Sequence, residues 1–95
     1  MSYISLGELY EVFIHPKADK QLEKLPEKDR IRIEEKLRLL SEFPRVKDIV
    51  KIQGRKSCYR LRVGKYRILF EVFKDKEIIV IAKIDVRGRI YKNLD

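Results

Sequence analysis

The sequence has few of the residues that build disulfides, metal sites and membrane spans. Its 95 residues include one cysteine, Cys58, and one histidine, His15. A single cysteine cannot form an internal disulfide, and a single histidine without a CxxC pair does not match the spacing of a familiar metal site. The longest apolar run, residues 78–82, has the length of a strand, whereas a membrane helix needs about 20 apolar residues.

Other expected signals are also missing. The first residues lack the basic and apolar segments of a secretory signal, and no GxGxxG or Walker-type loop occurs. We therefore expect a cytoplasmic protein that binds no metal, uses no cofactor and does not associate with a membrane. With 95 residues, the chain is long enough for one domain with one modest core.

Acidic residues are absent from the stretch of residues 51–67, which contains seven basic residues. Residues 1–50 carry ten basic and ten acidic residues, and residues 51–95 carry 13 basic and five acidic residues. The whole net charge of +8 therefore lies in the second part of the chain. A balance this basic indicates a polyanionic partner: nucleic acid, an anionic membrane or an acidic protein.

Hydropathy periodicity predicts a single domain over residues 1–95, with residues 1–9 as a loose extension. The expected strands cover residues 10–14, 49–52, 58–63, 66–73 and 77–84. The expected helices begin at Pro16 and Glu27 and are ended by Pro26 and Pro44. The element order β-α-α-β-β-β-β predicts an α+β fold, in which an N-terminal helical hairpin packs on a mostly antiparallel, twisted sheet.

One predicted hairpin has a register that can be worked out. Gly64 and Lys65 suit a two-residue turn of the Gly-X type, so Val63 should pair with Tyr66. Arg62 then lies directly opposite Arg67. Like charges placed opposite each other destabilise a strand pair by a few tenths of a kcal/mol up to about 1 kcal/mol.

The same register brings further residues to this side of the sheet. Arg60 shares the face of Arg62, and residues 83–85 of the next strand return beside Arg67, shortly before Arg87 and Tyr91. Alternating arginines on a strand can simply be a solvated face. Their convergence instead favours a phosphate-binding cluster, because guanidinium groups bind phosphate in a bidentate manner. Glu71, farther along the strand, is the acidic residue noted on this face.

The central segment CYRLRVGKYRILFEV, residues 58–72, resembles the signature of RelE-type toxins in the RelE/ParE superfamily. Residues 86–91, VRGRIY, resemble its C-terminal Arg…Tyr motif. Residues 51–54 resemble its KLxG strand and residues 18–26 its first helix. The resemblance spans roughly residues 10–92.

This resemblance implies the toxin of a type II toxin–antitoxin system, a ribosome-dependent endonuclease that cleaves mRNA in the ribosomal A site. Cleavage would be metal-independent, by attack of a ribose 2′-OH on the adjacent phosphate. The implied partners are an acidic, RelB-like antitoxin, the ribosome and mRNA.

The resemblance also assigns roles. Arg67 would hold the scissile phosphate. Arg87 would stabilise the transition state or assist the acid that protonates the leaving 5′-oxygen. Tyr91 would stack on a nucleobase or transfer a proton. Arg60 and Arg62 stand where family members often carry lysine. Because arginine cannot be deprotonated, these two can position and stabilise but are poor bases. Tyr91 is then the titratable candidate of the cluster, with packing against an edge as its alternative role.

Other basic residues would form an RNA- and ribosome-binding rim, or else solvated loop charges. This expected rim comprises Lys51, Arg55, Lys56, Arg60, Lys65, Arg89 and Lys92. His15 is expected to cap a helix, and Cys58 to be a small strand residue.

Two further functions stay open at this stage. One is a non-enzymatic, ParE-like toxin that inhibits DNA gyrase, against which the C-terminal Arg…Tyr pair argues. The other is a degenerate relative that only binds antitoxin or nucleic acid, which the absence of lysines at positions 60 and 62 favours. For the nuclease hypothesis, the sequence leaves the general base unassigned.

Overall fold

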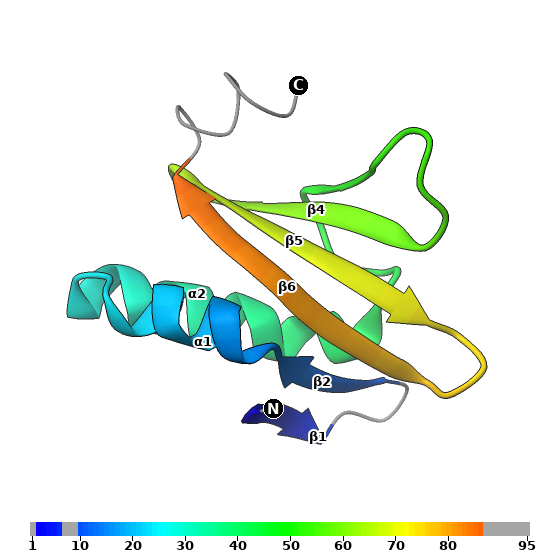
Figure 1. The fold of residues 1–95 in the computed structure, drawn as a ribbon, viewed down its shortest axis with the longest axis horizontal. Coiled ribbons are helices and arrows are strands. Elements are labelled where there is room, and N and C mark those ends of the chain that lie inside the picture. The colour runs from blue at the N-terminus through cyan, green and yellow to red at the C-terminus, as the bar shows by residue number, and fades with distance from the viewer. Residues whose placement is uncertain (1, 7–9, 87–95) are drawn as a thin grey trace.

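In the computed structural model, six strands form one sheet, and two helices lie against one face of this sheet (Figure 1). The structure describes residues 2–6 and 10–86. The strands are β1 (Ser2–Leu6), β2 (Glu11–Ile14), β3 (Ile49–Lys51), β4 (Cys58–Val63), β5 (Tyr66–Phe73) and β6 (Ile78–Val86). The helices are α1 (Pro16–Glu23) and α2 (Glu27–Leu39), which continues into the 3-10 turn η1 (Leu40–Glu42). The predicted α+β class and helical hairpin are confirmed.

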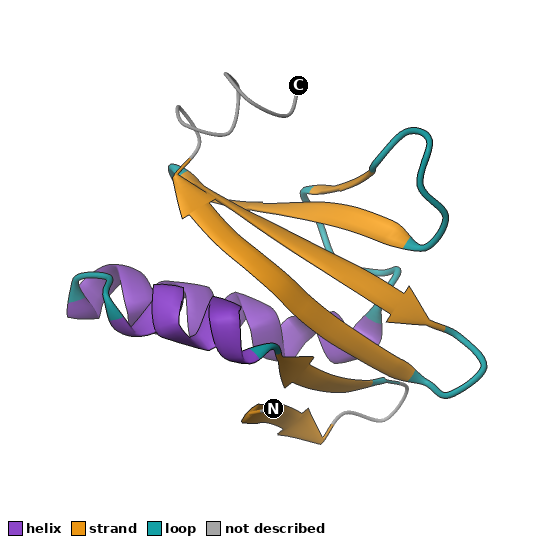
Figure 2. Cartoon of the chain, in the orientation of Figure 1, coloured by secondary structure: helices purple, strands orange, loops and turns teal. Residues whose placement is uncertain are grey.

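The strand order is β1-β2-β6-β5-β4-β3. Every neighbouring pair is antiparallel except β2 and β6, which are parallel. β5 lies inside the sheet, between β6 and β4 (Figure 2). Neither helix of the described residues is long and apolar enough to cross a membrane.

Residues 2–6 correct the expectation of a loose N-terminal extension. They form β1, which pairs antiparallel with β2 from Ser2 opposite Ile14 to Leu6 opposite Glu11, with a shift in register between Tyr3 and Ser5. The segment Tyr3-Ile-Ser-Leu6 alternates polar and apolar residues, but so short a run is a weak strand signal by itself. The otherwise open edge of β2 supplies the backbone partners that make it a strand.

The local sequence explains where the helices begin and end. The His15 side chain caps α1, because its Nδ1 accepts a hydrogen bond from the Lys17 N–H at 3.1 Å, and Pro16 occupies the first turn. This confirms the capping role expected for His15. Pro26 separates the helices, and acidic residues occupy the first turn of α2, where the helix dipole favours them.

The core lies between the helices and the face of the sheet that the helices cover. Ala18 and Leu22 of α1 and Ile33 and Leu37 of α2 are buried, as their helical spacing requires. The buried strand residues are Val12, Ile14, Leu61, Val63, Tyr66, Ile68, Phe70, Val72, Ile79, Ile81 and Ile84. Alternate residues of each strand therefore face the helices, and the residues between them lie on the opposite face, here called the open face.

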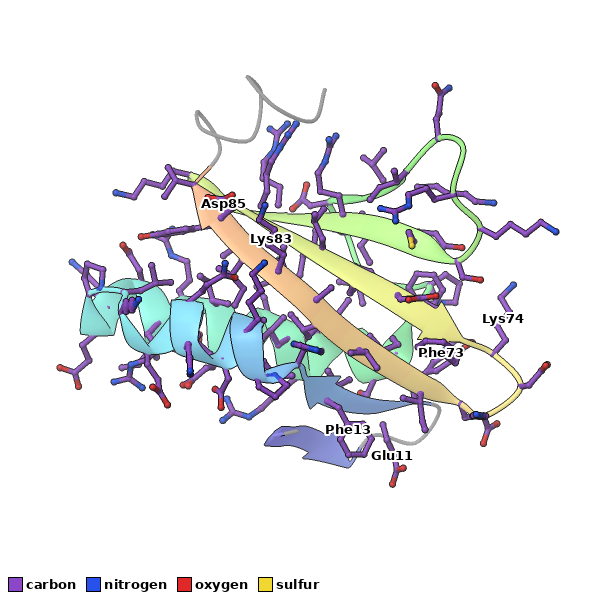
Figure 3. The ribbon with its side chains drawn as sticks, viewed as in Figure 1. Glu11, Phe13, Phe73, Lys74, Lys83 and Asp85 are labelled. Atoms are coloured by element: carbon purple, nitrogen blue, oxygen red, sulfur yellow. The ribbon has the colours of Figure 1, made fainter. Side chains whose placement is uncertain are left out.

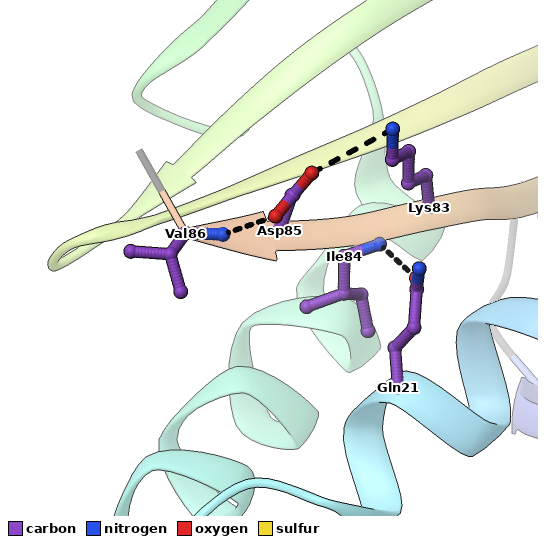
Figure 4. Close-up of polar contacts among 5 residues, drawn as sticks. All are labelled: Gln21, Lys83, Ile84, Asp85 and Val86. Carbon is purple, nitrogen blue, oxygen red and sulfur yellow. Dashed lines mark hydrogen bonds and ion pairs between the residues drawn. The ribbon is translucent and has the colours of Figure 1, made fainter. Parts of the chain in front are cut away.

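A break in register in β6 decides which of its residues reach the open face. The pairing of β5 with β6 shifts between Leu69 and Phe70, so that one extra residue of β6, Ala82, stands between the paired positions. As a result, Ile81 and Ile84 are both buried although they are three residues apart. Lys83 and Asp85 lie on the open face, while the Ile84 N–H donates to Gln21 Oε1 of α1 at 2.8 Å (Figure 4).

Candidate functional site

A row of charged residues crosses one end of the open face. Arg62 of β4 pairs with Arg67 of β5, and Arg67 pairs in turn with Asp85 of β6. The predicted hairpin register is therefore confirmed, including the pairing of Val63 with Tyr66. We call these three residues the arginine row. The next row holds Lys83 of β6 and Arg60 of β4, each paired with Leu69. Figure 3 labels Lys83 and Asp85 on β6.

The two arginines of the row differ sharply in exposure. Arg62 is exposed, whereas Arg67 is only 4% exposed and lies in the interior strand of the hairpin. A guanidinium buried this deeply must have hydrogen-bonding or charged neighbours, because an unpaired buried charge is strongly unfavourable. Arg67 therefore lies below the surface of the open face, and Arg62 presents its charge to an incoming anion.

Asp85 is the residue that sequence analysis missed. Its Oδ1 accepts a hydrogen bond from the Val86 N–H at 2.8 Å, and its Oδ2 lies 3.6 Å from the Lys83 Nζ (Figure 4). The sequence did contain the signal, since the predicted register already placed residues 83–85 beside Arg67. Only Glu71 was considered as an acidic residue of this face, and Glu71 lies two rows farther along β5.

The hairpin that carries the arginines is anchored to the helical layer. The Tyr66 hydroxyl donates to Asp29 Oδ2 of α2 at 2.6 Å, and Tyr66 directly precedes Arg67. This hydrogen bond raises the pKa of Tyr66, burial and the charge of Asp29 raise it further, and Arg32 lowers it. At the turn, Gly64 has a φ of 57°, and a Cβ there would lie 2.5 Å from the Arg32 Nη1. The positive φ favours glycine at this position, whereas the Arg32 contact is with the end of a flexible side chain that can shift.

Replacing Tyr66 with phenylalanine should lower the free energy of unfolding near neutral pH by about 1–3 kcal/mol, because Asp29 loses its buried donor. The raised pKa means that the folded protein holds the phenolic proton more tightly than the unfolded chain. The stabilisation is therefore complete below pH about 10 and declines as the pH rises above it. Urea unfolding of both proteins should show a difference that is constant up to about pH 9.5 and narrows as the pH rises above about 10. A difference that stays constant up to about pH 11 would contradict this origin.

Three members of the expected rim, Lys51, Arg55 and Lys56, lie away from the arginine row. Arg55 and Lys56 precede β4, so they lie at the other end of that strand, with Cys58 about 13 Å from Arg62 along β4. Lys51 pairs with Tyr59 and shares the helix-side face, where it lines a groove with Tyr10 and Phe43.

Lys65, by contrast, is close to the row. It lies in the turn that follows Arg62, with its Nζ 5.6 Å from the centre of the Tyr66 ring. The other predicted site residues, Arg87, Arg89, Tyr91 and Lys92, lie outside the described residues. Within residues 10–86, no group of three His, Cys, Asp or Glu side chains is arranged to hold a metal ion.

The arrangement suits recognition of a phosphate. Exposed Arg62 and neighbouring Arg60 can donate several charge-assisted hydrogen bonds to phosphate oxygens, and the row lies on a rigid three-strand platform rather than on a loop. Asp85 adds a proton acceptor to the same row. The site thus combines groups that stabilise negative charge with one that can accept a proton.

Comparisons with known proteins show the family to which this fold belongs. The family described as "ParE toxin of type II toxin-antitoxin system, parDE" matches residues 12–91, so β1 lies outside the match. Putative toxin RelE1 of Methanocaldococcus jannaschii is 36% identical over 87 residues, which cover 88% of this chain and 97% of that protein.

Solved structures are similar over nearly their whole length. The archaeal RelE–RelB complex from Pyrococcus horikoshii OT3 matches with a TM-score of 0.73 and 33% identity, covering 85% of this chain and 98% of that chain. The RelB–RelE antitoxin–toxin complex from Methanococcus jannaschii matches with a TM-score of 0.70 and 29% identity, covering 87% and 99%.

Proposed function

Because the chain belongs to the RelE/ParE family of toxins from type II toxin–antitoxin systems, we propose that it is a ribosome-dependent endonuclease that cleaves mRNA in the A site. The observation that carries the proposal is the arginine row, with Arg67 buried and Arg62 exposed. Two like charges directly across a strand pair oppose folding, and Asp85 is paired with Arg67 but not with Arg62, so exposed Arg62 can take up an external anion. Because these relatives are named RelE, they support mRNA rather than DNA gyrase as the target.

Cleavage proceeds by attack of the ribose 2′-OH on the adjacent phosphate, which places extra negative charge on the phosphorus oxygens. Arg62 stabilises that charge, and Arg67 holds the scissile phosphate from below. Arg60 binds the neighbouring backbone. Arg87 and Tyr91, which lie outside the described residues, serve the leaving-group side, as their sequence motif implies.

The partners follow from the charge and the family. A toxin with a net charge of +8 needs an acidic antitoxin, and the solved relatives are complexes with RelB. We therefore infer a RelB-like antitoxin as the natural inhibitor and the translating ribosome with its mRNA as the target. A toxin with this target acts in the cytoplasm.

Inhibition of DNA gyrase is the second candidate, because the matching family model is described as a ParE toxin. Two assays on the same purified toxin separate the candidates. In a reconstituted translation system, primer extension should show mRNA cut within the A-site codon, and free mRNA should stay intact. Intact mRNA on the ribosome would overturn the nuclease, and inhibition of gyrase supercoiling would establish the alternative. Inactivity in both assays would indicate a degenerate relative.

A further inference from the structure

Attack by a 2′-OH needs a group that removes its proton, and the arginines of the site cannot do so. Within residues 10–86, the arginine row and the row beside it contain two other ionisable side chains, Asp85 and Lys83. Lysine accepts a proton only after losing its own, and the Lys83 Nζ lies 3.6 Å from the carboxylate of Asp85. Lys83 also lies one row away from Arg62 and Arg67, whereas Asp85 lies in their row.

We propose that Asp85 is the general base of the cleavage reaction, an inference that rests on the proposed nuclease function. Asp85 is the direct cross-strand partner of Arg67, so it stands beside the residue that holds the scissile phosphate. Its side chain is 21% exposed, which leaves it accessible to a bound ribose.

The contacts of the carboxylate also suit this role. Oδ1 is fixed by the Val86 N–H at 2.8 Å, and Lys83 approaches Oδ2 at 3.6 Å, longer than a good hydrogen bond (Figure 4). A carboxylate has about four acceptor positions, so these contacts leave room for a 2′-OH. The backbone bond fixes the direction of the group, which preorganises it for proton transfer.

The step balances without a further reagent. The Asp85 carboxylate takes the proton of the 2′-OH while the 2′-oxygen forms a bond to phosphorus. The bond from phosphorus to the 5′-oxygen breaks, and that oxygen takes a proton from an acid of the site or from water. The products are a 2′,3′-cyclic phosphate and a 5′-hydroxyl end, and Asp85 then returns its proton to water. Arg62 and Arg67 stabilise the charge that develops on phosphorus oxygens.

The test separates proton transfer from charge and from folding. Asp85→Asn keeps an oxygen to accept from the Val86 N–H but cannot act as a base. Single-turnover cleavage on programmed ribosomes should slow about 100-fold or more. Binding to ribosomes that carry mRNA with a 2′-deoxy nucleotide at the cleavage position should be unchanged or tighter, because a negative charge is removed. A merely electrostatic or structural role would not lower the rate while preserving binding.

Glu71→Gln is the matched control, because it makes the same charge change two rows away on the open face and should cleave at the wild-type rate. In a second variant, Asp85→Ala, added formate should restore part of the lost rate by supplying a carboxylate. Cleavage by Asp85→Asn at the wild-type rate, an equal loss in Glu71→Gln, or a slow Asp85→Ala that formate does not rescue would overturn the assignment. If the wild-type protein leaves ribosomal mRNA intact, the nuclease function itself fails, and this inference with it.

Discussion

Replacing Arg62 with alanine should slow mRNA cleavage on the ribosome about 100-fold to 1000-fold, which is the usual cost of losing one preorganised group that stabilises transition-state charge. The same change should leave the free energy of unfolding unchanged or raise it by up to about 1 kcal/mol, because it removes a positive charge directly opposite Arg67. Activity and stability would then move in opposite directions, as expected of a residue retained for function rather than for folding.

Arg38→Ala is the control for this experiment. It makes the same charge change at an exposed position in the last turn of α2. Loss of a cation there weakens the interaction with the helix dipole by a few tenths of a kcal/mol to about 1 kcal/mol and should leave cleavage unchanged. Primer-extension time courses and urea unfolding measure the two effects. Similar losses of cleavage in Arg62→Ala and Arg38→Ala would show that only total charge matters and would contradict a specific role for Arg62.

Replacing Phe70 with alanine should lower the free energy of unfolding by about 3–5 kcal/mol, a large share of the stability of a small domain. Phe70 is 1% exposed in the interior strand of the sheet. Its ring stacks on Tyr59 with centres 5.7 Å apart and meets the edge of Phe43 at 6.0 Å. Removing the ring would leave a cavity where β5, β4 and the segment after η1 meet, and surrounding side chains can fill it only in part.

Phe73→Ala provides a control of the same chemistry on the same strand. Phe73 is 38% exposed on the open face, so its loss should cost less than about 1 kcal/mol. Urea unfolding of the two variants should therefore give clearly separated midpoints. Equal destabilisation would contradict the placement of the core on the helix side of β5.

The site could be predicted in part because a two-residue turn fixes the register of its strands. Gly64 and Lys65 determined that Arg62 faces Arg67, and the structure has this pairing. The deep burial of Arg67 could not be predicted from its own sequence context, because it depends on strands β4 and β6 lying on both sides of β5. The wide separation of Arg55 and Lys56 from the row likewise depends on the direction in which β4 runs.

By itself, the sequence determined the fold class, the helical hairpin, the order of the elements from Glu11 onward and the pairing of Arg62 with Arg67. These features follow from local periodicity, from prolines that end helices and from one tight turn, all of which act over a few residues.

Only the tertiary structure decided three others: the pairing of β1 with β2, the parallel pairing of β2 with β6, and the irregularity at Ala82 that makes Asp85, among residues 83–85, the partner of Arg67. Each depends on backbone hydrogen bonds or packing between separate strands, and a local pattern of residues does not specify the partner or the register of such a contact.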